Sequence, residues 1–198
     1  MLDGPRPRAG DLILANHVSW LDIPGLAGAT GCAFISKAEV RDHPFLKWIA
    51  DQNATVYIDR SDKRGIPAQA EAMRRALRTG QPIALFPEGT VGDGGRLLPF
   101  KPSLLSAVAP PPEGVTLKPV AVDYGDHARL FAWQPGERGM ANFFRVLGRR
   151  GRLPVTVRIL APLPATSDRK ALAAAAHDAI AQTLGFKLQA QSPIGERE

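Results

Sequence analysis

A histidine and an aspartate five residues apart are the first candidates for chemistry in this sequence. His17 and Asp22 belong to the segment Asn16–Asp22, which directly follows the apolar run Leu12–Ala15. A carboxylate that accepts a hydrogen bond from an imidazole fixes its tautomer and stabilises the imidazolium formed when the ring takes a proton. Because imidazole titrates near neutral pH, such a pair has the chemistry of a general base. The alternative is a helix-capping Asp22 beside a packed His17.

The pair requires a strand that ends before His17 and a helix that begins near Asp22. Sequence patterns predict strands over 11–16, 32–36, 55–58, 82–86, 117–123, 130–133 and 154–160. They predict helices over 21–28, 67–78, 104–109 and 168–184. Strands that alternate with helices indicate an α/β domain with a mixed, mostly parallel sheet flanked by helices. Functional loops then gather outside the carboxyl ends of the strands.

Length and composition indicate one globular domain over residues 1–198. We expect a motif-bearing core over about 10–125, a strand and a helix over 126–186, and a frayed tail over 187–198. Hydrophobic residues make up 44% of the chain and charged residues 22%. The net charge of +6 favours anionic partners. The one cysteine excludes an internal disulfide, and no cluster has metal-site spacing, so no metal is expected.

A second motif, Phe86–Thr90, also follows a predicted strand. Together with His17 and Asp22, it resembles the 1-acylglycerol-3-phosphate (lysophosphatidate) acyltransferase family of glycerolipid acyltransferases. The run Thr55–Arg60 is similar to the second block of that family, and Leu117–Val122 is similar to its fourth. Four blocks in the same order identify the chain as a member of this family.

The resemblance implies a role for each matched residue. His17 would deprotonate the acceptor hydroxyl, Asp22 would orient His17, and Arg60 would bind the acceptor phosphate. Lys101 would add a second positive charge near that phosphate. The acceptor site would also be lined by Glu88, Gly89 and Thr90. For Arg60 the alternative is an ion pair on its own loop, and for Glu88 it is a hydrogen bond within its own loop.

The implied reaction moves an acyl group from a thioester to an alcohol. The donor would be acyl-CoA or acyl-carrier protein, which are substrates, and no cofactor is implied. The glycines that follow Glu88 could supply backbone N–H groups to the developing negative charge. No Gly-x-Ser-x-Gly motif is present, which favours direct attack by the alcohol over an acyl-enzyme. Many family members have Arg-Ser after the threonine of the third block, where this chain has Val91 and Gly92.

The expected function is acylation of lysophosphatidate to phosphatidate. Another lyso-lipid, such as lyso-ornithine lipid or lysophosphatidylglycerol, is the alternative acceptor. A basic nucleic-acid-binding module and an inactive lipid-binding relative are rival readings, although the chain has no nucleic-acid motif and we expect no nucleic-acid partner. A further expectation is that His127 and His177 are exposed side chains.

We expect peripheral attachment to the cytoplasmic face of the cell membrane. No apolar run is long enough to span a bilayer and no signal peptide opens the chain. Family members usually carry apolar helices before the first block, whereas ten residues precede the first strand here; whether a membrane segment is missing is left open. Two stretches could meet lipid: Pro44–Trp48, and the arginine cluster within 145–152, for which a solvated face is the alternative.

Overall fold

The computed structural model describes residues 1–37, 51, 55–58, 71, 75–77, 80–134 and 136–186. Its strands are β1 (Leu2–Asp3), β2 (Asp11–Ala15), β3 (Ala33–Lys37), β4 (Val56–Ile58), β5 (Ile83–Leu85), β6 (Thr116–Asp123) and β7 (Thr156–Ile159). Its helices are α1 (Asp22–Thr30), α4 (Ala128–Phe131), α5 (Gly139–Leu147) and α6 (Arg169–Thr183), with short 3-10 helices η3 (Pro102–Leu105) and η4 (Gly125–His127). Pro44–Trp48, Arg60 and the tail after residue 186 lie outside the described residues, as does most of the predicted helix over 67–78.

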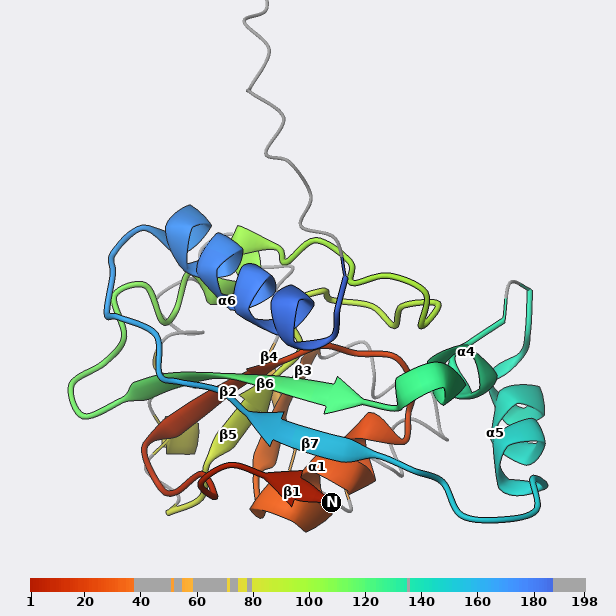
Figure 1. The fold of residues 1–198 in the computed structure, drawn as a ribbon. Coiled ribbons are helices and arrows are strands. Elements are labelled where there is room, and N and C mark those ends of the chain that lie inside the picture. Colours follow the sequence, from red (N-terminus) through yellow and green to blue (C-terminus); the bar gives the residue numbers. More distant parts are fainter. Residues whose placement is uncertain are drawn as a thin grey trace, which may run out of the picture.

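The strands form one sheet in the order β1-β7-β6-β2-β5-β3-β4 (Figure 1). From β6 to β4 all neighbours are parallel, whereas β7 runs antiparallel to β6. The predicted mixed, mostly parallel sheet is therefore confirmed. Since β2, β5 and β6 are parallel, their carboxyl ends meet at one edge, which we call the carboxyl edge.

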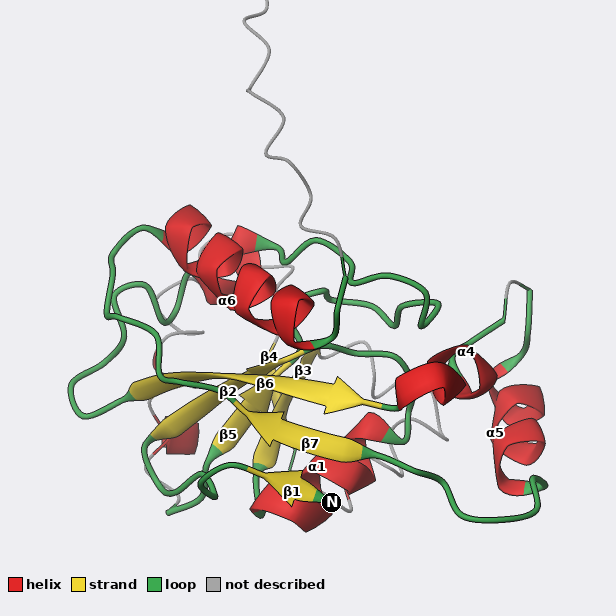
Figure 2. Ribbon diagram, viewed as in Figure 1, coloured by secondary structure: helices red, strands yellow, loops and turns green. Residues whose placement is uncertain are grey.

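Helices cover both faces of the sheet, with α6 on one face and α1 on the other (Figure 2). The central strand β2 is buried throughout and contributes side chains to the hydrophobic cluster on each face of the sheet. Leu12 and Leu14 pack in the cluster that includes Leu172 of α6, whereas Ile13 and Ala15 pack in the cluster that includes Leu26 of α1. Burial on both faces explains why β2 is a continuous apolar run rather than an alternating one.

The region between β6 and β7 differs from its prediction. The strand expected over 130–133 is wrong, because residues Ala128–Phe131 form the single turn α4. A four-residue apolar run does not distinguish a strand from a buried helical turn. The helix α5 was not predicted, and it lies with α4 beyond the end of β6 (Figure 1). Among the described residues, no helix is long and apolar enough to cross a membrane.

Candidate active site

His17 and Asp22 meet at the carboxyl edge, where β2 ends and α1 begins. The Nδ1 atom of His17 lies 2.8 Å from Oδ2 of Asp22. The Asp22 side chain is fully buried, whereas 15% of the His17 side chain is exposed. A carboxylate only accepts hydrogen bonds, so this contact places the proton of the neutral ring on Nδ1 and leaves Nε2 free to accept one.

Asp22 accepts hydrogen bonds from four groups, one of which is the imidazole. The backbone N–H groups of Val18 and Ser19 donate to its Oδ2 at 2.6 and 2.8 Å. The hydroxyl of Tyr124 donates to its Oδ1 at 2.5 Å. Burial, followed by the charge of Asp22, raises the pKa of Tyr124 well above its ordinary value, so the phenol keeps its proton. Asp22 is thus held in one orientation by its own turn and by Tyr124, the residue that follows β6.

Stacking and backbone pairing hold the segment that carries His17. The imidazole stacks on Phe86, with ring centroids 4.1 Å apart and planes 11° apart. The side chain of Asn16 accepts from the Val122 N–H at 2.8 Å and donates to the Val122 carbonyl at 3.0 Å. These contacts fix His17 between the ends of β5 and β6, which agrees with a side chain that must meet a substrate in one geometry.

Glu88 connects the two motif loops from a buried position. Its Oε1 accepts the N–H of His17 at 2.6 Å, and its Oε2 accepts the N–H of Leu98 at 3.1 Å. Only 2% of the residue is exposed. Burial raises the pKa of Glu88 to about 8, against the opposing effect of the two N–H donors. The carboxyl group therefore holds the backbone of His17 in place.

The glycines after Glu88 use several of their N–H groups to shape the loop. Gly89 donates to the Phe86 carbonyl at 3.1 Å, and Gly92 donates to the His17 carbonyl at 2.7 Å. Gly89 has φ +70, and a Cβ there would lie 3.3 Å from the Lys101 Nζ. These two N–H groups already have protein acceptors, so they are not free to bind an oxyanion in this arrangement.

Two pockets open beside Glu88. One, of about 380 Å³, is lined by His17, Glu88, Arg96 and Tyr124 among others. The second, of about 630 Å³, shares Glu88 with the first. Its charged and hydroxyl-bearing lining residues are Glu88, Thr90, Lys101, Ser103, Arg169 and Lys170. The second pocket thus combines residues of the third motif block with two cations from the start of α6.

The structure brings together most of the residues that the sequence singled out. His17 and Asp22 are in contact, Glu88 bonds to His17, and Thr90 and Lys101 lie on the neighbouring pocket. Arg60 lies outside the described residues. The roles assigned to these residues stay predictions.

Sequence reasoning missed Tyr124, which contacts Asp22 across 102 positions of sequence. A signal was available, because Tyr124 directly follows the predicted strand over 117–123 and so had to lie at the carboxyl edge with His17. His177 also differs from its prediction. It is 9% exposed rather than a surface side chain, and it packs edge-on against Phe100. In the described part of the chain, no group of three or more His, Cys, Asp or Glu side chains could hold a metal ion.

With His17 as the general base that the motif resemblance implies, replacing Tyr124 with phenylalanine is expected to lower kcat roughly tenfold, because the hydroxyl that holds Asp22 Oδ1 is lost. The ring itself stays packed against Phe131, whose centroid is 5.3 Å away. KM should change little, since the phenol acts through Asp22. Steady-state kinetics on Tyr124→Phe would check this, and an effect confined to KM would instead place the hydroxyl on the substrate.

The raised pKa of Glu88 predicts that the stability of the fold depends on pH. Its carboxyl titrates near 4.5 in the unfolded chain and near 8 in the folded one. Between these values the folded state binds a proton that the unfolded state has lost, so its contribution to stability is complete below pH 4.5 and is lost as the pH rises through 8. We expect Tm to fall over this range in the wild type and to fall less in Glu88→Gln. Parallel Tm profiles for the two proteins would show that Glu88 does not titrate there.

Comparisons with known proteins agree with the motif pattern. The sequence matches a family model described as "Acyltransferase" over residues 5–123. It is 37% identical over 169 residues to the lyso-ornithine lipid O-acyltransferase of Rhizobium meliloti, covering 79% of this chain and 57% of that protein. It is 35% identical over 122 residues to the 1-acyl-sn-glycerol-3-phosphate acyltransferase of Neisseria gonorrhoeae, covering 62% and 47% of the two chains.

A solved structure shares the fold. The crystal structure of the 1-acyl-sn-glycerophosphate acyltransferase PlsC from Thermotoga maritima superimposes with a TM-score of 0.62 at 23% identity, covering 93% of this chain and 70% of that one. At this identity the likeness concerns the fold alone. The chain spans little more than half the length of the Rhizobium relative.

Proposed function

Because this chain belongs to the acyltransferase family, we propose that it is an O-acyltransferase that esterifies the free hydroxyl of a lyso-lipid. The observation that carries the proposal is the His17–Asp22 contact at the carboxyl edge. A buried carboxylate holds an imidazole with its unprotonated nitrogen available, beside a pocket that can admit an alcohol. This arrangement suits a general base rather than a covalent nucleophile.

In the proposed reaction, His17 Nε2 accepts the proton of the acceptor hydroxyl as its oxygen attacks the carbonyl carbon of the thioester. Asp22 stabilises the imidazolium that results. The tetrahedral intermediate then collapses, the C–S bond breaks, and the departing thiolate takes the proton from the imidazolium. An ester and a free thiol are the products, and His17 returns to its starting state.

The donor is an acyl thioester, either acyl-CoA or acyl-carrier protein. The second pocket supports an anionic group on one of the two substrates, since Lys101, Arg169 and Lys170 line it together. Three cationic side chains around one pocket can bind phosphate or carboxylate oxygens through charge-assisted hydrogen bonds. Arg60 is a further proposed ligand of an acceptor phosphate.

Two acceptors are proposed, in order of support. Lyso-ornithine lipid comes first, because alignments to relatives named for that substrate cover 79–90% of this chain. Lysophosphatidate comes second, because the relative named for it matches over a shorter span and the basic pocket suits a phosphate. An ornithine headgroup carries a carboxylate and an ammonium group, whereas lysophosphatidate carries a phosphate, so the two differ in charge.

The test offers each acceptor to the purified protein with acyl-CoA, and then with acyl-carrier protein, and identifies the products by mass spectrometry. Lyso-ornithine lipid, lysophosphatidate and lysophosphatidylglycerol are compared at equal concentration. We expect an ester product that gains one acyl chain, with the highest kcat/KM for lyso-ornithine lipid. Absence of any ester product from folded protein with both donors would contradict the proposal.

A further inference from the structure

Helix α5 presents an apolar stripe to solvent. Met140, Phe144 and Leu147 are 48%, 65% and 52% exposed. Their spacing of four and three residues places them on one side of the helix. Asn142 and Val146 are buried on the opposite side. Large apolar side chains exposed as a continuous row indicate a surface that another molecule covers.

Exposed arginines extend this stripe. Arg149, Arg150 and Arg152 follow α5 directly and are exposed. Arg149 also lies over the Phe131 ring, 5.7 Å from its centroid. We call these three arginines and the three apolar residues the α5 surface. Apolar side chains beside clustered cations are typical of helices that lie in the headgroup region of an anionic bilayer.

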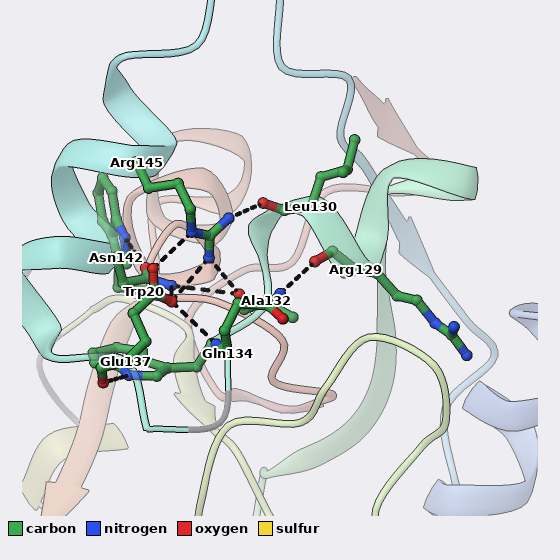
Figure 3. Close-up of polar contacts among 9 residues, drawn as sticks. Trp20, Arg129, Leu130, Ala132, Gln134, Glu137, Asn142 and Arg145 are labelled. Atoms are coloured by element: carbon green, nitrogen blue, oxygen red, sulfur yellow. Dashed lines mark hydrogen bonds and ion pairs between the residues drawn. The ribbon is translucent and has the colours of Figure 1, made fainter.

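A polar network holds α5 rigidly on the domain (Figure 3). Arg145 points inward from α5, where its Nε donates to Glu137 Oε1 at 2.7 Å and its Nη1 donates to the Leu130 carbonyl at 2.6 Å. The hydrogen bond from Arg145, with smaller contributions from those of Asn142 and the Gln134 N–H, lowers the pKa of Glu137 to about 2. Arg145 is therefore a structural member of the arginine cluster and Arg149 packs on Phe131, whereas Arg150 and Arg152 present exposed side chains.

The same network connects α5 to the candidate site. Asn142 accepts from the Trp20 indole N–H at 3.1 Å, and Trp20 lies between His17 and Asp22 in the chain. The Leu130 carbonyl of α4 and the Ala132 carbonyl that follows it accept from Arg145, and α4 begins at Ala128 on the wall of the His17 pocket. The α5 surface therefore lies on the same side of the domain as the carboxyl edge, where a lipid acceptor has to arrive.

We propose that the α5 surface docks the protein on an anionic lipid bilayer. Phe144 and Leu147 enter the headgroup region, and Arg150 and Arg152 contact lipid phosphates. A second copy of the chain is a poorer occupant, because a symmetric contact would bring two sets of arginines together. The proposal rests on the proposed function, because a lipid acceptor would reach the candidate site from the docked bilayer. Docking itself is measured without turnover.

The test measures binding to vesicles of phosphatidylglycerol and phosphatidylcholine, and to phosphatidylcholine alone, by co-sedimentation. An apolar pair, Phe144→Gln with Leu147→Gln, and a basic pair, Arg150→Glu with Arg152→Glu, are compared with the wild type. The matched control is Arg6→Glu with Arg8→Glu. These exposed residues precede β2, at the opposite edge of the sheet from His17. Circular dichroism and Tm confirm that each variant is folded.

We expect salt-sensitive binding of the wild type to the anionic vesicles, and a loss of about tenfold or more in each α5 pair but not in the control pair. Turnover of a short-chain, water-soluble acceptor should be unchanged in the α5 pairs. Unchanged vesicle binding in both α5 pairs would overturn the proposal, as would an equal loss in the control pair or a wild-type dimer that the apolar pair dissociates without affecting vesicle binding. Failure of acyl transfer in the wild type would count against the proposed function and leave the vesicle result to decide the docking surface.

Discussion

Replacement of His17 by alanine is expected to lower kcat by about 10²–10⁴-fold, the usual contribution of a general base. The proposed reaction has no other group to take the proton of the acceptor hydroxyl. The fold should survive, because Asp22 keeps its hydrogen bonds from Val18, Ser19 and Tyr124. KM should change much less than kcat, since the base acts mainly in the transition state.

The matched control for this variant is His127→Ala. His127 is an exposed histidine that ends η4, and it takes no part in the proposed reaction. Steady-state kinetics with saturating donor, together with Tm for both variants, would separate chemistry from folding. Near-normal turnover in folded His17→Ala would refute the assigned base.

Asp22→Asn is expected to reduce kcat by a similar factor, about 10²–10⁴-fold, for a different reason. The amide that replaces the carboxylate can turn its NH₂ toward His17, which would then carry its proton on Nε2 and lose the ability to accept one. A lower Tm should accompany this loss. Two backbone N–H groups donate to the same oxygen of Asp22, and an amide cannot satisfy all of its neighbours.

Nitrogen NMR of the His17 ring separates a change of tautomer from a loss of stability in Asp22→Asn. The wild type should carry the proton on Nδ1 of His17, and Asp22→Asn should move it to Nε2. Asp178→Asn provides the matched control, because Asp178 also contacts a histidine, His177, at 3.2 Å but lies on α6 outside the site. An Asp22→Asn protein with an unchanged tautomer and full turnover would show that Asp22 is only a structural cap.

The His17–Asp22 pair could be predicted because both residues belong to one local strand-turn-helix unit. The apolar run before His17 requires a buried strand, and the four residues between His17 and Asp22 are enough to turn the carboxylate back to the ring. The partners of Asp22 and His17 from elsewhere could not be predicted in the same way. Tyr124 and Glu88 reach them only because β6 and β5 are the neighbours of β2, and that order is set by the packing of the whole sheet.

The helix α5 was not predicted from the sequence because its buried side does not follow an apolar pattern. Asn142 is fully buried and Arg145 is turned inward, and both are satisfied by Glu137 and by the backbone carbonyl of Ala132. A buried polar residue is stable only with its partners in place, and those partners lie outside the helix. From the sequence, the arginines of 145–152 are interpreted as one charged face. In the structure Arg145 instead bonds to Glu137, whereas the other three arginines are exposed.

The measurement that tests the central claim most directly is thiol release from acyl-CoA in a rapid-mixing experiment, with and without the lyso-lipid acceptor. Direct attack by an alcohol that His17 activates predicts no thiol release and no mass change of the protein until the acceptor is added, followed by release matched one to one by ester product. A burst of thiol without acceptor, with an acyl group covalently attached to the protein, would contradict the account.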